Sequence, residues 1–346
     1  MLIPKFRNLV HFCKTLKAIH NKPSLALLER NIRLGSTVAL GQGITLVEST
    51  REEDRELAQQ LLNALMPFTG NATRIGITGV PGVGKSTFIE AFGKHLTAQG
   101  KKIAVLAIDP SSGKTKGSIL GDKTRMEELA KDPLAFIRPT AAGAALGGVA
   151  YRTREAMLLC EAAGFDVVLI ETVGVGQSET SVRNLVDYFL LLMLAGAGDE
   201  LQGIKKGIIE MADGLVITKA DGDNQKRATQ AQADFQYALH LFPSPESGVK
   251  TNVLTCSAIT NQGIAEVWQT IEQFVETTRQ NGFFELNRSE QDIGWFEELF
   301  EQRWRQQLLK RQGVAELKQN LEIQIKAKKI SPTEAVNLLF AAMSKS

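Results

Sequence analysis

The chain contains the segment Gly79-Val80-Pro81-Gly82-Val83-Gly84-Lys85-Ser86-Thr87. The segment matches G-x-x-x-x-G-K-S/T in full, the pattern of a glycine-rich loop that cradles phosphate groups. An apolar run at 74–78 precedes it, and a pattern with apolar residues on one helix face begins near Lys85. The sequence therefore predicts a strand, a phosphate-binding loop and a helix in succession. A glycine turn without a ligand is the alternative, and the complete match in this setting argues against it.

Each residue type in this loop suits the binding of a triphosphate. Glycines let the backbone turn so that successive N–H groups point toward a β-phosphate, and the helix start adds the positive end of its dipole. Lys85 is predicted to act in catalysis by reaching the β- and γ-phosphates, and the Ser86 hydroxyl to coordinate Mg²⁺. The loop residues predicted to bind the nucleotide are Gly82, Val83, Gly84, Lys85, Ser86 and Thr87.

Short apolar runs alternate with helical patterns between residues 71 and 282. Their continuous apolar character is typical of strands buried on both faces of a parallel sheet. The candidate strands are 74–78, 103–108, 166–171, 188–194, 214–218 and 252–255. We therefore predict an α/β fold, a P-loop NTPase domain with a mostly parallel sheet flanked by helices.

Helical extensions are predicted on both sides of this domain. In the N-terminal arm, residues 1–70, Thr50 and Glu53 have the spacing of a capping box, and Leu57, Leu61 and Leu65 repeat on one helix face.

The C-terminal extension, residues 283–346, reads as two helices. One face carries Phe296, Phe300, Trp304 and Leu308, and Ser331 begins a second capping box. The extension could pack on its own core or pair with a second subunit, and the pattern leaves both open.

A downstream motif indicates which base is bound. Thr218-Lys219-Ala220-Asp221 ends a predicted strand, where GTPases usually carry N-K-x-D. The Asp221 carboxylate would accept both N–H donors of guanine, which adenine does not offer, so GTP or GDP is the predicted ligand. Thr218 keeps a hydroxyl but loses the amide that normally ties this segment to the phosphate loop. Ser257 and Ala258 follow the next strand and suit a backbone contact to the guanine O6.

Oxygen ligands for Mg²⁺ are predicted near the phosphate loop. With Ser86, the candidates are Asp109, Asp122 and Glu171, each at a strand end or after a glycine-bounded segment. Solvated carboxylates are the alternative for each acid taken alone. Gly174 could sense the γ-phosphate through its N–H, and Gln177 could orient the attacking water. Slow intrinsic hydrolysis is the expectation.

Composition and charge limit the classes of partner and the cellular compartments that fit the chain. The net charge is +2 without a dense basic stripe, which disfavours nucleic acid as a partner, and the longest apolar run, at 189–197, is about half of a membrane span. Three separated cysteines argue against a disulfide framework and favour a reducing compartment, the cytoplasm. Neither they nor the four scattered histidines have the spacing of a zinc site. The basic N-terminus reads as a surface helix or as a mitochondrial presequence, which would place a eukaryotic protein in the matrix.

Five longer segments resemble the MeaB/ArgK family of methylmalonyl-CoA mutase-associated GTPases, within the P-loop metallochaperone GTPases. They are GITGVPGVGKST (76–87), IDPSS (108–112), GSILGDKTRM (117–126), ETVGVGQSE (171–179) and GAGDELQGIK (196–205). The resemblance covers most of the chain and includes ITLVESTR (44–51) in the helical arm. Departures are Lys116 where the family usually has Gly, and a segment at 141–145 that is usually richer in Pro and Ser.

This resemblance implies a homodimer that pairs through its helical extensions and binds a coenzyme-B12-dependent acyl-CoA mutase. With GTP, such proteins gate the loading of adenosylcobalamin and help discard inactivated cofactor. The resemblance places Ser86, Asp109, Asp122 and Glu171 around Mg²⁺ and residues 197–205 in an additional switch loop. It makes Lys205 the candidate for assisting hydrolysis.

Two rival functions and one weaker reading remain open at this level. A nickel-enzyme maturation GTPase would resemble the chain around the phosphate loop but carry Cys/His metal sites. A kinase would need a separate acceptor pocket and base. A pure binding module would leave the Mg²⁺ residues without a use.

Overall fold

The computed structural model describes residues 24–109, 126–141, 148–172, 178–196, 206–311 and 313–343. The chain divides into two compact units, 1–285 and 286–346. No helix within the described ranges combines the length and the apolar character that crossing a membrane requires.

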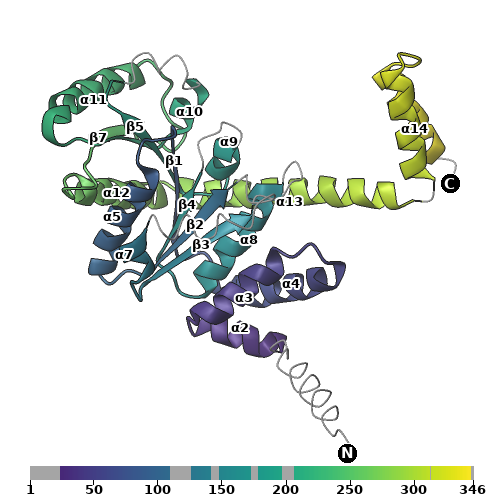
Figure 1. The fold of residues 1–346 in the computed structure, drawn as a ribbon, viewed down its shortest axis with the longest axis horizontal. Helices are drawn as coiled ribbons and strands as arrows, with labels where there is room; N and C mark the ends of the chain where they lie inside the picture. Colours follow the sequence, from purple (N-terminus) through teal and green to yellow (C-terminus); the bar gives the residue numbers. More distant parts are fainter. Residues whose placement is uncertain are drawn as a thin grey trace, which may run out of the picture. The chain divides into compact units, whose positions relative to one another are not determined.

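A seven-stranded sheet, parallel throughout, forms the centre of the first unit (Figure 1). Its order is β3-β2-β4-β1-β5-β6-β7. The strands are β1 (Thr73–Gly79), β2 (Ile103–Asp109), β3 (Ala135–Ala141), β4 (Val167–Glu171), β5 (Tyr188–Leu194), β6 (Gly214–Thr218) and β7 (Asn252–Thr255). The predicted α/β fold with a parallel sheet is confirmed, and each of the six predicted strands is present.

Strand β3 was not predicted. It contains Arg138 and Pro139, which interrupt the apolar run that marks a buried strand. The edge position explains both residues, because proline is tolerated on an edge strand and a long polar side chain can leave the sheet there. Arg138 binds the Glu48 carboxylate at 2.6 Å and the Gly41 carbonyl at 3.3 Å. The edge of the sheet is thereby fastened to the N-terminal helices.

Helices cover both faces of the sheet. The helices of the first unit that flank it are α5 (Lys85–Ala98), α7 (Glu127–Ala130), α8 (Gly148–Ala162), α9 (Ser178–Arg183), α10 (Lys206–Met211), α11 (Gln225–Leu239) and α12 (Ile264–Gln280). One cluster of buried side chains joins α5, α7 and α12 to the strands, with Phe92 stacked on Phe88 and edge-on to Trp268. A second cluster joins α10 and α11 to β5 and β6. The core therefore lies on both sides of the sheet.

On the other edge strand, β7, side chains of α11 bind the outward-facing backbone groups of one residue. Gln232 Nε2 donates to the Val253 carbonyl at 2.7 Å, and Gln236 Oε1 accepts from the Val253 N–H at 3.2 Å. Both backbone groups of the residue in the middle of this edge are therefore occupied.

Aspartates accept hydrogen bonds from backbone N–H groups at the amino-terminal ends of the strands. Each comes directly before one strand and accepts the free N–H at the start of the neighbouring strand. The pairs are Asp166 with Lys102 N (2.7 Å), Asp187 with Arg74 N (2.8 Å) and Asp213 with Phe189 N (2.8 Å).

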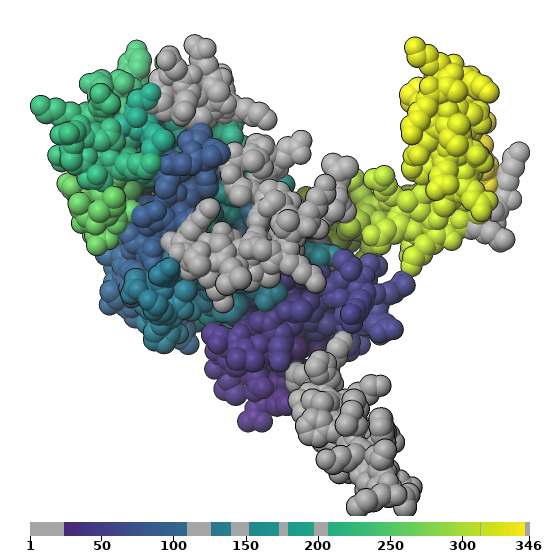
Figure 2. Space-filling view, viewed as in Figure 1, coloured from purple at the N-terminus to yellow at the C-terminus, as the bar shows by residue number. Residues whose placement is uncertain are grey.

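The N-terminal helices α2 (Leu25–Arg33), α3 (Thr37–Val47) and α4 (Glu52–Leu65) pack on α8, and η1 (Met66–Phe68) leads to β1. Figure 2 shows this N-terminal part in purple against the rest of the first unit. Leu61 and Leu65 are buried as predicted, while Leu57 is 37% exposed. The predicted cap at Thr50 is wrong, because α4 begins after Arg51. The Ser49 hydroxyl instead donates to Asp54 at 2.7 Å and accepts from the Arg51 N–H.

The second unit consists of helices: most of α13 (Phe283–Lys310), α14 (Val314–Lys326) and α15 (Pro332–Met343). The sequence predicted two helices here, and the structure contains three. The predicted cap of the last helix is confirmed, because Ser331 Oγ accepts from the Glu334 N–H at 3.1 Å. On α13, the rings of Phe296, Phe300 and Trp304 stack in a row, and each is at least half exposed.

Candidate functional site

The phosphate loop joins β1 to α5, and glycine is required at both of its ends. Gly79 ends β1 with φ 154°, and a Cβ there would lie 2.5 Å from the Leu192 carbonyl oxygen. Gly84 caps α5 with φ 95°, a conformation that other residues rarely adopt. The loop therefore points the start of α5 at the space where phosphate groups would lie.

The Lys85 ammonium lies inside this loop. It donates to the carbonyls of Gly79 at 2.7 Å and Val80 at 3.3 Å. Burial lowers the pKa of Lys85 from its usual value, while the charges of Glu171 and Glu179 act in the opposite direction. A rotation of the side chain would move the ammonium from the carbonyls to phosphate oxygens, which is the contact predicted from the sequence.

Ser86 and Glu171 meet at the carboxyl end of β4. The Ser86 hydroxyl donates to Glu171 Oε1 at 3.2 Å, and Glu171 is 9% exposed. The pairing of Ala107 with Glu171 places Asp109, two residues later, at the same edge of the sheet. A hydroxyl and carboxylates are hard oxygen donors, so the residues present fit Mg²⁺.

Several predicted site residues lie outside the described residues. They are Asp122, Gly174, Gln177 and Lys205, together with the side chain of Asp109. Across the described ranges, no group of three or more His, Cys, Asp and Glu side chains could hold a metal ion.

A second acid near Lys85 was not predicted as a site residue. Glu179 lies in the first turn of α9, is 2% exposed and acts electrostatically on Lys85. The only signal in the sequence was its place in the segment 171–179. Its approach to the loop depends on how α9 packs, which local sequence does not specify.

The end of β6 is attached to the phosphate loop at two points. The Thr218 hydroxyl donates to the Val83 carbonyl at 2.7 Å, and the Lys219 ammonium donates to the Gly82 carbonyl at 2.9 Å. The Thr218 hydroxyl thus ties this segment to the phosphate loop, at the position where GTPases usually carry an asparagine. Lys219 has φ 56°, a left-handed conformation that directs its side chain back over the loop.

Asp221 is held by the strand end that follows it in the sheet. Ser257 Oγ donates to Asp221 Oδ2 at 2.5 Å and accepts from the Thr260 N–H at 3.2 Å. The Ala220 N–H also donates to the Cys256 carbonyl at 2.9 Å. Residues that are 36 positions apart in sequence are therefore brought together, with Ala258 directly beside them. The fixed carboxylate suits two parallel N–H donors of a guanine base.

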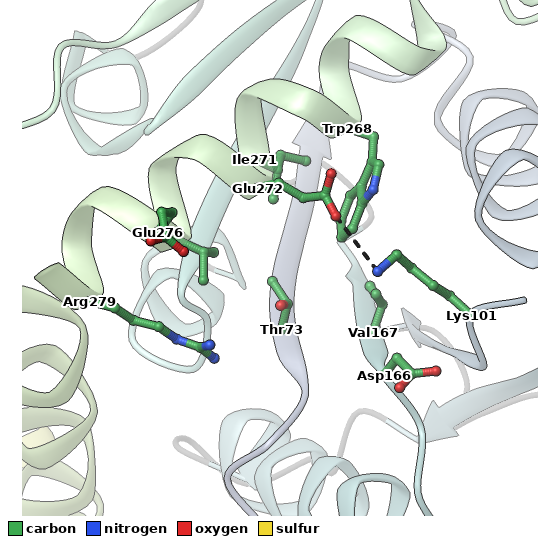
Figure 3. Close-up of a pocket in the computed structure, with 10 residues that line it drawn as sticks. Thr73, Lys101, Asp166, Val167, Trp268, Ile271, Glu272, Glu276 and Arg279 are labelled. Carbon is green, nitrogen blue, oxygen red and sulfur yellow. Dashed lines mark ion pairs between the residues drawn. The ribbon is translucent and has the colours of Figure 1, made fainter. Parts of the chain in front are cut away.

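A separate cavity of about 230 Å³ lies at the opposite edge of the sheet, where β1 and β4 begin. Figure 3 shows Lys101 reaching toward Glu272 of α12, at 3.6 Å, on one side of this cavity. No residue of the phosphate loop lines it. The cavity is therefore distinct from the site described above.

Known proteins resemble the chain over most of its length. The family model for "Methylmalonyl Co-A mutase-associated GTPase MeaB" matches residues 40–313. GTPase ArgK of Escherichia coli is 50% identical over 80% of this chain and 83% of its own length. The mitochondrial methylmalonic aciduria type A homolog of Mus musculus is 43% identical over 89% of this chain and 77% of its own length.

A solved structure of a protein described as an LAO/AO transport system kinase has the same fold. It aligns with a TM-score of 0.75 and 39% identity, over 94% of this chain and 99% of its own. The match of the family model to most of the chain, together with these relatives, identifies the family. The chain belongs to the MeaB family of methylmalonyl Co-A mutase-associated GTPases.

Proposed function

We propose that the chain uses GTP binding and hydrolysis to gate the loading of adenosylcobalamin onto a B12-dependent acyl-CoA mutase of the methylmalonyl-CoA mutase type. The nucleotide part rests on one arrangement, the attachment of the strand end that carries Asp221 to the phosphate loop through Thr218. The mutase part rests on membership of a family whose name includes this enzyme.

Within the site, each residue has a proposed role. Gly82, Val83, Gly84, Lys85, Ser86, Thr87 and Gly174 contact the phosphates, and Thr218, Lys219, Asp221, Ser257 and Ala258 form the guanine pocket. Ser86, Asp109, Asp122 and Glu171 hold Mg²⁺ directly or through water, and the ion supplies positive charge that neutralises the phosphate oxygens. Burial lowers the pKa of Lys85, and the charges of Glu171 and Glu179 oppose this by favouring the protonated ammonium that phosphates would bind.

Hydrolysis is proposed to depend on Gln177 and Lys205 in addition to Lys85. Gln177 would orient the attacking water, and Lys205 would stabilise the charge that develops on the transferred phosphate. Single-turnover hydrolysis by Gln177→Ala and Lys205→Ala separates the two roles from nucleotide binding. A residue whose replacement leaves the rate unchanged has no part in catalysis.

The C-terminal unit is proposed to form the interface of a homodimer. The exposed row of Phe296, Phe300 and Trp304 on α13 offers the large apolar side chains that commonly form the centre of such an interface. A second copy would cover a surface that is costly to leave in water.

A cofactor-transfer assay tests the proposed function. The purified chain is mixed with adenosylcobalamin and apo-mutase in the presence of GDP, GTP or a non-hydrolysable GTP analogue. We expect mutase association and cofactor transfer to depend on which nucleotide is bound, and this dependence to be lost in Lys85→Ala. Lys131→Ala, which removes an exposed lysine of α7's C-terminal end, serves as control. Association that is the same with every nucleotide contradicts the proposal.

A further inference from the structure

Helices α9 and α10 occupy equivalent places after two successive strands. Strand β4 ends on the side of the sheet that carries the phosphate loop, and β5 begins on the opposite side. Helix α9 lies in the connection that crosses back between them. The helix α10 has the same position between β5 and β6. The two helices pack against each other, and Figure 1 shows them side by side. Each follows a residue that the proposed function places at the phosphates, with Gly174 before α9 and Lys205 directly before α10.

An ion pair joins the end of α9 to the residue pair that follows α10, on the side of the sheet opposite to the phosphate loop. Arg183, the last residue of α9, lies 3.5 Å from Asp213 Oδ1, and Asp213 follows α10 by two residues. The side chains are 20% and 8% exposed, so water screens the pair little. The same aspartate exchanges two hydrogen bonds with Phe189, through its Oδ2 and its own N–H. The two bonds orient the Asp213 carboxylate so that its Oδ1 is left for Arg183.

The end of α9 is also fixed on its other side. Arg154 of α8 donates to the Asn184 carbonyl at 2.7 Å, directly after the last residue of α9. A cation at this end of a helix satisfies a carbonyl that has no partner within the helix. The far end of α9 is thus a point at which α8, α9 and the segment after α10 are held together.

The negative charge of Asp213 is costly where it lies. Burial raises the pKa of Asp213 to about 6, and the nearby Asp187 acts in the same direction, while Arg183 and the Phe189 N–H oppose them. An asparagine could accept the Phe189 N–H without this cost. The charge adds an attraction to Arg183 that an asparagine would not provide.

We propose that Arg183 and Asp213 are positioning residues that couple α9 to α10, so that a nucleotide-driven displacement of α9 also displaces α10. The start of α9 carries the buried Glu179, whose charge acts on the Lys85 ammonium, so a change at the phosphate loop would reach this helix first. Its far end passes the change on through the ion pair. The inference rests on the proposed nucleotide switching but not on the mutase partner.

Hydrogen exchange of the full chain, followed by mass spectrometry, tests the coupling. Exchange is compared between the GDP complex and the complex with a non-hydrolysable GTP analogue, in peptides that cover 178–183 and 206–211. In the wild-type chain we expect both helices to change. In Asp213→Asn and Arg183→Gln we expect the change in α9 to persist and the change in α10 to fall by about half or more.

Controls separate the coupling from general damage. Arg183→Lys keeps the charge and should restore most of the α10 change. Asp166→Asn removes a strand-start aspartate that accepts a backbone N–H in the same way, and should leave both helices responding. An α10 response in Asp213→Asn or Arg183→Gln equal to that of the wild type overturns the inference, as does a wild-type response confined to α9. No wild-type response in either helix contradicts the proposed switching as well.

Discussion

The Thr218 hydroxyl donates a 2.7 Å hydrogen bond to the Val83 carbonyl, which connects the end of β6 to the phosphate loop. Thr218 is 4% exposed, so a lost bond would leave a buried carbonyl without this partner. We expect Thr218→Val to reduce the free energy of unfolding by about 1–3 kcal/mol and GDP affinity by about tenfold. Thr218→Ser retains the hydroxyl and should stay close to wild type. Denaturant unfolding measures the stability and calorimetry the affinity. Equal values for the two variants would show that the hydroxyl contributes to neither.

Asp221→Asn exchanges an acceptor for a donor at the base. GDP affinity should fall by about a hundredfold or more, because the guanine N–H groups would then face an unsuitable partner. Xanthosine diphosphate should bind better than it does to the wild type, since its edge offers the complementary acceptor. Titration calorimetry with both nucleotides gives the comparison. Unchanged GDP affinity contradicts the assignment of Asp221 to base recognition.

Ser257→Ala tests how far Asp221 depends on its hydrogen bond. The 2.5 Å contact and the Thr260 N–H fix Ser257 and thereby orient the carboxylate. We expect a smaller loss of GDP affinity than in Asp221→Asn, about tenfold, with preference for guanine over xanthine retained. A loss of base preference in Ser257→Ala would instead place the serine itself in contact with the base.

The raised pKa of Asp213 predicts how stability depends on pH. Its pKa is about 6 in the folded chain and about 4 when unfolded, so the folded state holds the proton more tightly. The stabilisation that this provides is complete below about pH 4 and is lost as the pH rises through about 6. The wild-type unfolding free energy, relative to Asp213→Asn, should therefore fall by on the order of 2 kcal/mol from pH 4 to 7. Urea unfolding at both pH values measures this, and a difference independent of pH contradicts it.

Arg74 and Glu161 form a buried ion pair whose disruption should be severe. Arg74 Nε donates to Glu161 Oε1 at 2.7 Å, and the side chains are 8% and 0% exposed. Glu161 also accepts from the Gly70 N–H, which links the N-terminal helices to β1. Glu161→Ala should cost about 3–5 kcal/mol in unfolding free energy, because Arg74 then loses its buried counter-charge. The exposed pair of Lys131 and Glu128 is the control, and Lys131→Ala should leave the unfolding midpoint unchanged.

Phe300→Glu tests the proposed dimer interface. A charge in the middle of the aromatic row on α13 should convert a dimer to a monomer, seen by light scattering after size-exclusion chromatography. Glu301→Gln, at the next position, should not. GDP affinity should be the same in both variants. A wild-type chain that is monomeric at all concentrations contradicts the proposed interface.

The sequence was most informative where function depends on local pattern. The phosphate loop and the strand before it could be predicted because glycine conformation, lysine charge and strand apolarity are properties of adjacent residues. Strand β3 could not, since the edge position that tolerates Arg138 and Pro139 is set by the whole sheet. The start of α4 was misplaced because Ser49 binds Asp54, a local competitor that the capping-box pattern does not reveal.

Side-chain contacts between segments distant in sequence could not be predicted. The motif placed Asp221 and Ser257 in the same pocket, but the hydrogen bond that orients the carboxylate depends on the neighbouring ends of β6 and β7. Glu179 had no pattern of its own, since its effect on Lys85 follows from the packing of α9. Asp213 and Arg183 meet for the same reason.

The two glutamines of α11 that occupy the backbone of Val253 restrict how this molecule can be recognised. A foreign β-strand that approached β7 would find its central amide and carbonyl already engaged, so the sheet cannot readily be extended there. Binding of a partner by strand addition and edge-to-edge aggregation are both disfavoured at β7. A binding protein that meets the chain at this border must therefore contact helices and loops around β7 instead of adding a strand to it.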